Sequence, residues 1–402
     1  MNILFLTMSA FTEIEIHNIY ADLMKEYIRN GHRPYIVTPS EKKLGEKTEL
    51  VNYPDYSILK VEIGNINGVS LIEKGISTVT LSGKFYHAVK HNLGHLKFDL
   101  ILYSTPPITL ATPVKRLKKL FGCRTYLMLK DIFPQNAVDL GMFSQHGVIY
   151  WYFREQEKQL YRISDYIGCM SPSNVEYVKK HNPQIPKECI EICPNAIKPQ
   201  NVTHMRDVSI RTKYGIPEES VVFMYGGNLG KPQGIPFLME CIRCLKSHRD
   251  AFLVVCGNGS EYQMLYDLKH NEDIDNWILI QGLPKKEYDS LLAVCDVGLV
   301  FLDNRFTIPN FPSRILSYME QSIPVLACTD MVTDIGKVIT EGRFGWWCQS
   351  NDSNGFSKIC GEILKNRENL SEIGGNGRRF LEENYHVEIA YKVIQTHLES
   401  RR

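Results

Sequence analysis

The segment Gly226-Gly227-Asn228 could bind an anion. It directly follows the apolar run 221–225, which is typical of a buried strand. Glycine lets the backbone approach a phosphate closely, and a helix after such a turn offers free N–H groups and the positive end of its dipole. The pattern matches neither the Gly-x-Gly-x-x-Gly dinucleotide fingerprint nor a Walker A loop. Two interpretations stay open: a phosphate-binding turn, and a strand-to-helix turn that binds nothing.

A second glycine-rich segment, which contains Gly257 and Gly259, follows the apolar run 252–256. Its signal is weaker, because the ends of parallel strands are often rich in glycine for packing reasons. It supports a ligand site only together with the first segment.

A third candidate is the end of the segment 307–314. Ser313 can cap the helix expected after it, and Arg314 would lie in the first turn of that helix. A cation is unfavourable at this end of a helix dipole unless an anion such as a diphosphate lies nearby. The alternative is a solvated arginine without a ligand.

Lys130 and Asp131 follow the apolar run 125–129. A charged pair at the carboxyl end of a strand is well placed for chemistry in a cleft. The alternative is that Asp131 only caps the segment that follows it.

The loop 9–17 after the first apolar run carries Glu13, Glu15 and His17. These side chains could contact a hydroxyl-rich acceptor, because carboxylates and imidazole accept hydrogen bonds and protons.

Two segments could contact a membrane surface. Residues 113–121 form a short basic amphipathic stretch, and residues 148–154 form an aromatic cluster beside a cation. Each segment also has an ordinary explanation. Residues 113–121 could form a solvated helix face, and residues 148–154 could form a helix in the core. No apolar run approaches the roughly 18 residues that span a bilayer.

The order of elements predicts where these groups lie. Short apolar strands alternate with helical patterns in both halves, and the segment 194–199 reads as a linker because it is bounded by prolines. This alternation predicts an α/β fold with two doubly wound parallel sheets, whose ligands bind beyond the carboxyl ends of the strands. The expected strands are 3–7, 34–38, 99–103, 125–129 and 166–169, then 221–225, 252–256, 277–281, 297–301 and 324–327.

Composition excludes several classes of protein. The chain has 402 residues, of which 44% are hydrophobic and 23% charged, so it is not disordered overall. Its formal net charge of +1 gives no basic field for nucleic acid. The 11 cysteines are scattered through apolar segments without zinc-finger spacing, which predicts reduced thiols in a cytosolic protein and no metal site.

Taken together, the motifs resemble glycosyltransferase family 4. The resemblance is carried by YGGNLGKPQG at 225–234, FLVVCGNGSE at 252–261, FPSRILSYM at 311–319 and KDIFPQ at 130–135. It covers nearly the whole chain and is nearest to the capsule and O-antigen branch, which includes N-acetyl-L-fucosamine transferases.

The resemblance implies a GT-B fold, with two Rossmann-like domains facing a cleft. It implies an acceptor-binding domain over 1–198, a nucleotide-sugar-binding domain over 199–385 and a helix over 386–402 that crosses back to the first domain. It further implies transfer from a UDP-sugar with retention of configuration, without a cofactor or an essential metal. The expected acceptor is a polyprenyl-diphosphate-linked saccharide, handled by a peripheral enzyme on the cytoplasmic face of the cell membrane.

Carried over to this chain, the family pattern implies catalytic roles for Asp131 and Lys130 and acceptor contacts for Glu13, Glu15 and His17. The implied donor-binding residues are Gly226, Gly227, Asn228, Gly257, Gly259, Asn310, Phe311, Ser313, Arg314 and Ser317.

The chain also departs from the family pattern. A cationic pair of the family falls on the uncharged Asn228 and Gln233, and a pair of glutamates falls on Pro309 and Ser317. Two alternatives therefore stay open: a UDP-sugar 2-epimerase of the same fold, and a non-catalytic subunit of a glycan assembly complex.

Overall fold

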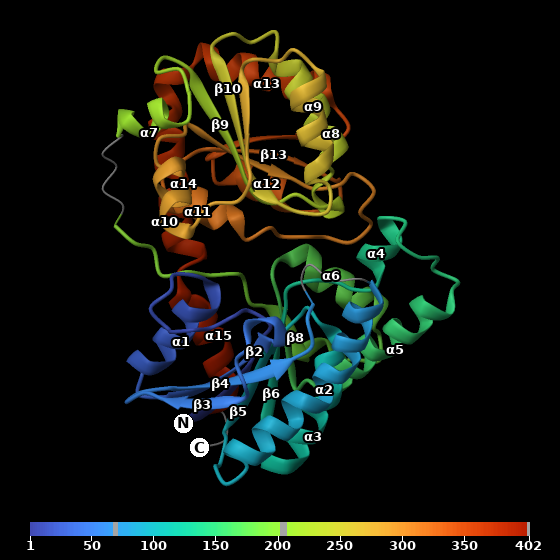
Figure 1. Cartoon of the computed structure of the whole chain (residues 1–402). Helices are drawn as coiled ribbons and strands as arrows, with labels where there is room; N and C mark the ends of the chain where they lie inside the picture. The colour runs from blue at the N-terminus through green and yellow to red at the C-terminus, as the bar shows by residue number, and fades with distance from the viewer. Residues whose placement is uncertain (67–70, 202–206, 400–402) are drawn as a thin grey trace. The chain divides into compact units, whose positions relative to one another are not determined.

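The computed structural model describes residues 1–66, 71–201 and 207–399 (Figure 1). The chain divides into two compact units. One consists of Met1–Lys198 together with His386–Arg402, and the other of Pro199–Tyr385. The divisions after residues 198 and 385 coincide with those expected from the sequence.

In the described part of the first unit, eight strands form one sheet in the order β3-β4-β2-β1-β5-β6-β7-β8. All neighbours are parallel except β3 and β4, which form an antiparallel pair. The strands are β1 (Asn2–Leu6), β2 (Arg33–Glu41), β3 (Glu49–Asn52), β4 (Ser57–Ile63), β5 (Leu100–Ser104), β6 (Arg124–Leu129), β7 (Tyr166–Cys169) and β8 (Ile190–Ile192). The helices are α1 (Ile19–Arg29), α2 (Leu71–Leu93), α3 (Ala111–Phe121), α4 (Gln135–Asp139), α5 (Val148–Ile163), α6 (Pro172–His181) and α15 (Val387–Glu399).

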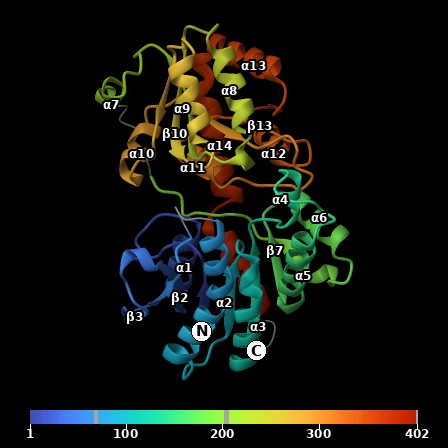
Figure 2. The same cartoon turned by 45° about the vertical axis from the view of Figure 1, so that its right-hand side comes forward.

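In the described part of the second unit, six parallel strands follow the order β11-β10-β9-β12-β13-β14. They are β9 (Val221–Asn228), β10 (Ala251–Asn258), β11 (Trp277–Ile280), β12 (Val297–Phe301), β13 (Val325–Thr329) and β14 (Gly345–Gln349). The helices are α7 (Val208–Lys213), α8 (Ile235–Leu245), α9 (Tyr262–Asn271), α10 (Lys285–Leu292), α11 (Arg314–Glu320), α12 (Ile335–Glu341), α13 (Ser353–Lys365) and α14 (Leu370–Asn384). Helices cover both faces of this sheet, with α8, α9 and α13 on one face and α11 and α14 on the other (Figures 1 and 2).

Local sequence explains the elements that position the site. The Asn18 side chain caps α1 by accepting hydrogen bonds from the amides of Tyr20 and Ala21, and Gly31 follows the helix with φ +75°. The central strands β1, β5 and β12 are almost entirely apolar runs and are buried, as expected for parallel strands with both faces covered, whereas β2, β3 and β4 also carry polar and charged residues. The predicted doubly wound architecture is therefore confirmed for both units.

The helix α15 belongs to the core of the first unit. Val387 and Ile394 are fully buried there, and Ile197 pairs with His386 where the chain returns to this unit. His397 Nε2 lies 2.8 Å from Glu191 Oε1, and its ring stacks on Tyr166 at 3.6 Å between centroids. A helix nearly two hundred residues away in the chain thus completes the first unit. No described helix has the length and apolar character needed to cross a membrane.

Candidate functional site

The glycine-rich segments lie side by side at the carboxyl ends of β9 and β10. Gly227 pairs with Gly257 in the parallel register, so both segments are the last residues of strands. The prediction of a turn at Gly226-Gly227-Asn228 is therefore wrong. The strands extend beyond their apolar runs because each end pairs with the other.

Two of these glycines are required by packing. A Cβ atom on Gly257 would lie 1.8 Å from the Gly227 carbonyl oxygen, and one on Gly259 would lie 2.2 Å from the Leu229 carbonyl oxygen. Gly226 in turn makes room for the phenol of Tyr288, whose oxygen would lie 2.1 Å from an added Cβ. These contacts account for Gly226, Gly257 and Gly259 without a ligand.

Gly227 differs because its missing side chain makes room for a cation. Its φ is +131°, which residues with a side chain rarely adopt, and an added Cβ would lie 3.2 Å from Arg314 Nη2. The guanidinium of Arg314 therefore lies against the bare backbone at the end of β9.

Arg314 is the first residue of α11, as predicted, but it is not a solvated side chain. It is half-buried, and its guanidinium carbon lies 4.6 Å from the ring centroid of Tyr225. No aspartate or glutamate of the described chain forms an ion pair with it, and its Nη1 is buried without a hydrogen-bond partner there. An arginine without a counter-ion beside exposed backbone is suited to bind an anion.

The expected cap on α11 is absent. Ser313 has φ −65° and ψ −16°, and its side chain makes no capping hydrogen bond. A capping side chain needs an extended backbone to reach the next amides, whereas Ser313 already has helical angles. The prediction that Ser313 caps this helix is wrong, and its hydroxyl is exposed at the helix start.

The uncharged residues at the positions of the family's cationic pair bind each other. Asn228 Nδ2 donates to Gln233 Oε1 at 3.0 Å. Arg305 does not replace the lost charge, because it donates twice to the carboxylate of Asp303, at 2.8 and 2.7 Å. Lys231 is exposed at the start of a short 3-10 helix near Glu261, whose pKa is raised by burial in spite of that lysine.

The remaining predicted donor-site residues have distinct surroundings. The Asn310 amide donates to Thr333 Oγ1 at 2.9 Å, and the Thr333 amide donates to buried Asp330 at 2.8 Å. Burial raises the pKa of Asp330 although the hydrogen bonds from the Thr333 and Val332 amides oppose the shift. Phe311 is 3% exposed and packs on Tyr385, so its ring serves the core. Ser317 is partly buried on α11.

In the first unit, Asp131 lies after β6, next to Thr105 at the end of β5. Thr105 Oγ1 accepts a hydrogen bond from the Lys130 amide at 3.0 Å, and Asn136 Nδ2 donates to Asp131 Oδ1 at 2.8 Å. Burial raises the pKa of Asp131 to about 6, and the hydrogen bond from Asn136 only partly opposes this shift. This carboxyl group therefore changes its charge close to neutral pH.

Lys130 does not act with Asp131 as a charged pair. Its side chain lines a narrow cavity beside Met128 and Cys193, and no ion pair joins it to Asp131. Burial lowers the pKa of its ammonium group. The structure therefore places only Asp131 with Thr105 and Asn136.

His17 is held by a buried carboxylate. Its Nδ1 lies 2.8 Å from Asp22 Oδ2, and the same carboxylate binds Lys25 Nζ at 2.8 Å and the Lys198 amide at 3.0 Å. Burial alone would raise the pKa of Asp22, but these hydrogen bonds lower it. His17 follows β1, the neighbour of β5, so it lies toward the same carboxyl edge as Thr105.

Glu13 and Glu15 lie away from the groups around Asp131. Both are exposed near Tyr56, where burial and then the charges of these carboxylates raise the pKa of the phenol. Tyr56 precedes β4, at the end of the sheet where the parallel strands begin. The structure therefore does not bring Glu13 and Glu15 to Asp131.

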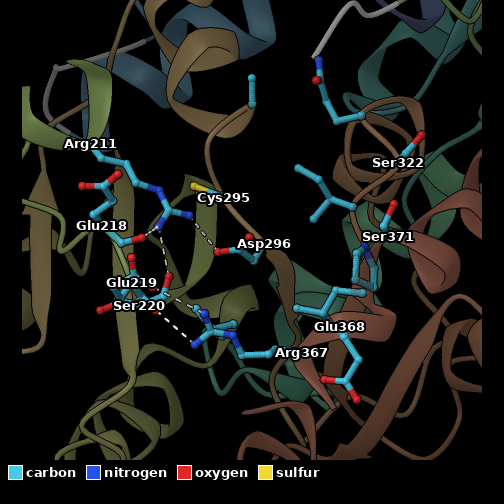
Figure 3. Close-up of a pocket in the computed structure, with 16 residues that line it drawn as sticks. Arg211, Glu218, Glu219, Ser220, Cys295, Asp296, Ser322, Arg367, Glu368 and Ser371 are labelled. Atoms are coloured by element: carbon cyan, nitrogen blue, oxygen red, sulfur yellow. Dashed lines mark hydrogen bonds and ion pairs between the residues drawn. The ribbon is translucent and has the colours of Figure 1, made fainter. Parts of the chain in front are cut away.

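A separate polar cavity of about 320 Å³ lies at the opposite, amino ends of β9, β12 and β13 (Figure 3). Arg211 donates hydrogen bonds there to the carbonyls of Val294, Glu218 and Ser220 and to the Asp296 carboxylate. Because the Asp296 carboxylate compensates its charge and protein oxygens accept its hydrogen bonds, Arg211 has a structural role and offers no site for an anion.

Sequence reasoning missed the partners that orient these groups. Thr105, Asn136 and Asp22 belong to none of the motifs, and Tyr225 begins a motif that gives no sign of its contact with Arg314. Within the described ranges, no three His, Cys, Asp or Glu side chains are gathered as a metal ion requires.

Comparisons with known proteins relate the chain to glycosyltransferases. Residues 208–380 match the family Glycosyl transferases group 1. The chain is 25% identical over 357 residues to a Pseudomonas aeruginosa protein named Probable glycosyltransferase WbjE. These residues make up 88% of this chain and 84% of that protein. It is 24% identical over 226 residues to N-acetyl-alpha-D-glucosaminyl L-malate synthase of Bacillus anthracis, covering 56% of this chain and 57% of that one.

Among solved structures, Anabaena HepE in complex with UDP matches with a TM-score of 0.69 at 15% identity, covering 99% of both chains. The chain thus has the GT-B fold of two Rossmann-like domains. The family match over residues 208–380, which lie in the second unit, and the curated relatives support glycosyltransferase activity.

Proposed function

We propose that this protein is a retaining glycosyltransferase that moves a sugar from a UDP-sugar to a polyprenyl-diphosphate-linked saccharide. The observation that carries the proposal is Arg314, a half-buried arginine that has no counter-ion among the described residues and lies against Gly227 at the carboxyl end of β9. The negative charge of a diphosphate would compensate the charge of Arg314, and its oxygen atoms would accept hydrogen bonds from the guanidinium.

In this proposal the donor diphosphate lies over the end of β9. The bond between the anomeric carbon and the diphosphate oxygen breaks, and negative charge builds on the leaving group. Arg314 and the bare backbone at Gly227 stabilise that charge electrostatically. The guanidinium thereby supplies the positive charge that a metal ion supplies in other transferases. UDP is favoured as the leaving group because HepE, a protein of the same fold, was solved with UDP.

Asp131 would act on the acceptor. As a carboxylate above pH 6, it accepts a hydrogen bond from the attacking hydroxyl and orients it. The new bond joins the acceptor oxygen to the anomeric carbon, on the face that the diphosphate leaves. The departing diphosphate oxygen lies on that face and takes the hydroxyl proton, so the balance needs no further reactant.

The sugar and the acceptor are proposed from the family resemblance. An N-acetylated 6-deoxy sugar such as N-acetyl-L-fucosamine, and a capsule or O-antigen acceptor, fit the branch that the motifs resemble. The malate synthase among the relatives is named for a small acceptor, so a soluble carboxylic acid is the alternative to test in parallel. A lipid-linked acceptor would bring the enzyme to the inner face of the cell membrane.

The first test measures thermal stabilisation by UDP, GDP, dTDP and CMP, without metal and then with magnesium. A ligand that binds only the folded state raises its stability by RT ln(1 + [L]/Kd), about 2.7 kcal/mol at 100 Kd. We expect a selective, metal-independent response to UDP. The absence of any response would contradict a donor site at Arg314.

Product analysis separates the alternatives. A changed sugar still attached to UDP would identify a 2-epimerase, and UDP binding without turnover of any UDP-sugar and acceptor pair would identify a non-catalytic subunit. A sugar transferred with its configuration retained is the expected result.

A further inference from the structure

The polar cavity at the amino ends of β9, β12 and β13 carries more negative than positive charge on its walls. Its volume of about 320 Å³ lies in the range of cavities that bind small molecules. Two arginines and four carboxylates line it, which gives a formal charge of −2: Arg211 and Arg367 against Glu218, Glu219, Asp296 and Glu368. The lining therefore favours a positively charged ligand.

The two arginines and two of the carboxylates compensate each other. Arg211 Nη2 lies 2.9 Å from Asp296 Oδ2. Arg367 Nη2 lies 3.7 Å from Glu219 Oε2, and Arg367 Nη1 also donates to the Glu219 carbonyl at 3.3 Å. Because these two pairs add no net charge, the charge of the lining comes from the two remaining carboxylates.

The remaining carboxylates are those of Glu218 and Glu368. Neither forms an ion pair with another residue of the described ranges. Figure 3 shows Glu218 on the side of Arg211 and Glu368 on the side of Ser371, and both glutamates are exposed. A metal ion needs its ligands gathered around one point, and the part of the chain that the structure describes holds no such group. Carboxylates on separate sides of a cavity suit an organic cation with two separated charges.

The wall of the cavity also contains a polar atom that lacks a partner. Gln321 is 9% exposed, and its Oε1 is buried without a hydrogen-bond donor from any described residue. A buried acceptor that has lost its bonds to water and gained no other bond destabilises the folded state. Because Gln321 lines the cavity, a ligand with N–H groups can supply the missing donor from there.

The turn at the end of α11 fixes Gln321 in the wall. Ser322 follows Gln321 with φ +53°, and its amide donates to the Met319 carbonyl at 3.1 Å. The Ile323 amide donates to the Tyr318 carbonyl at 2.9 Å. These two hydrogen bonds form a Schellman motif, which sets the direction of the chain after a helix. The unsatisfied oxygen therefore belongs to a residue whose backbone is held on both sides.

We propose that this cavity binds a small organic dication such as a diamine. The carboxylates of Glu218 and Glu368 compensate its two positive charges, and one of its N–H groups donates to Gln321 Oε1. The site lies at the amino ends of the strands, whereas Gly227 and Arg314 lie toward the carboxyl ends. Binding of a dication here does not depend on the proposed glycosyl transfer.

The test is titration calorimetry of the full chain with putrescine, whose two amino groups are protonated at neutral pH. Magnesium chloride and glucose are the comparison ligands, because the first carries the same charge on a single atom and the second carries none. We expect putrescine to bind and the other two to give no binding heat.

Removal of the two unpaired charges tests the assignment of the carboxylates. The double substitution Glu218→Gln with Glu368→Gln should weaken putrescine binding by about tenfold, since two exposed ion pairs are lost. Glu372→Gln with Glu383→Gln is the matched control, because both glutamates are exposed on α14 and lie outside the cavity. The control should bind putrescine as the wild type does.

A second variant tests the buried oxygen of Gln321. Gln321→Met keeps a similar volume and needs no hydrogen bond, so without a ligand it should melt at a higher temperature than the wild type. It should also bind putrescine more weakly, by about tenfold. A lower melting temperature together with unchanged putrescine binding would contradict the role of this oxygen.

Three further outcomes would overturn the proposal. Absence of putrescine binding would mean that the cavity holds water only. Equal binding of magnesium chloride would reduce the effect to screening of surface charge, and equal losses in the two double variants would place the binding outside the cavity. Thermal stabilisation by UDP, measured on the same proteins, reports the donor site separately, so the two proposals can fail independently.

Discussion

The guanidinium carbon of Arg314 lies 4.6 Å from the ring centroid of Tyr225, and the Tyr225 hydroxyl donates to the Asn228 carbonyl at 2.7 Å. The ring that supports the cation is thus fixed to the end of the strand on which Gly227 lies. An arginine held by an aromatic face keeps its charge for a ligand, unlike Arg305, whose charge is compensated by Asp303.

Arg314→Ala should weaken UDP binding by about tenfold to a hundredfold, because a hydrogen bond to a charged group contributes about 1.5–3 kcal/mol. Titration calorimetry with UDP measures this change directly. Arg305→Ala is the control and should change the Kd less than threefold. Equal effects of the two substitutions would contradict the assignment of the phosphate contact to Arg314.

Gly227→Ala should displace Arg314, because the new methyl group would lie 3.2 Å from Nη2 at a φ of +131°. We expect weaker UDP binding and a loss of about 1–3 kcal/mol of stability from the strained backbone. Gly375→Ala is the comparison, since nothing lies within 4 Å of its added Cβ and its helix α14 favours alanine. Unchanged UDP binding in Gly227→Ala would show that ligand binding does not use this close approach.

Asp131 should make activity and stability depend on pH in opposite directions. Its pKa of about 6 in the folded protein exceeds the ordinary 3.8, so the folded state holds the proton longer than the unfolded state. Stability therefore falls as the pH rises from about 4 to 6, while kcat/KM rises with an inflection near 6 as the carboxylate forms.

Asp131→Asn should accordingly stabilise the fold at pH 8 by up to about 3 kcal/mol and reduce kcat by about 10²–10⁴-fold. Thermal melts and initial rates across pH check both effects. Asp55→Asn, at an exposed position, should change neither. A flat stability profile for the wild type between pH 4 and 6 would argue against a buried carboxyl group at Asp131.

Lys130→Met should leave kcat within a few-fold of the wild type, because the ammonium group faces Cys193 rather than Asp131. Its pKa is lowered in the folded protein, so at neutral pH the unfolded state binds the proton more strongly and the wild type is destabilised. The variant should melt at a higher temperature at pH 7, and the gain should shrink toward pH 10. A kcat reduced by a hundredfold or more would restore a catalytic role for Lys130.

That Arg314 follows the strands of one parallel sheet, and Asp131 a strand of the other, could be predicted from the order of strands and helices alone. The conformation at 226–228 could not, because the last residues of β9 are extended only through pairing with β10. The separation of Lys130 from Asp131 could not be predicted either, because both residues lie beyond the end of β6 at Leu129, where strand alternation no longer applies.

Other features depend on contacts between distant segments. Whether Trp151 is core or surface cannot be read from an aromatic run, since both environments favour such residues. The stacking of Arg314 on Tyr225 joins residues 89 positions apart, and no local pattern encodes it.

The return of α15 to the first unit has a consequence for synthesis. Val387 and Ile394 fill the core of a unit whose other residues end at Lys198, and the whole second unit is made in between. Pro199–Tyr385 is continuous and can fold as it emerges from the ribosome, whereas the first unit waits for its closing helix. During that interval the apolar face awaiting α15 is open, so chaperones should engage nascent chains stalled before residue 386 more than those stalled after residue 399.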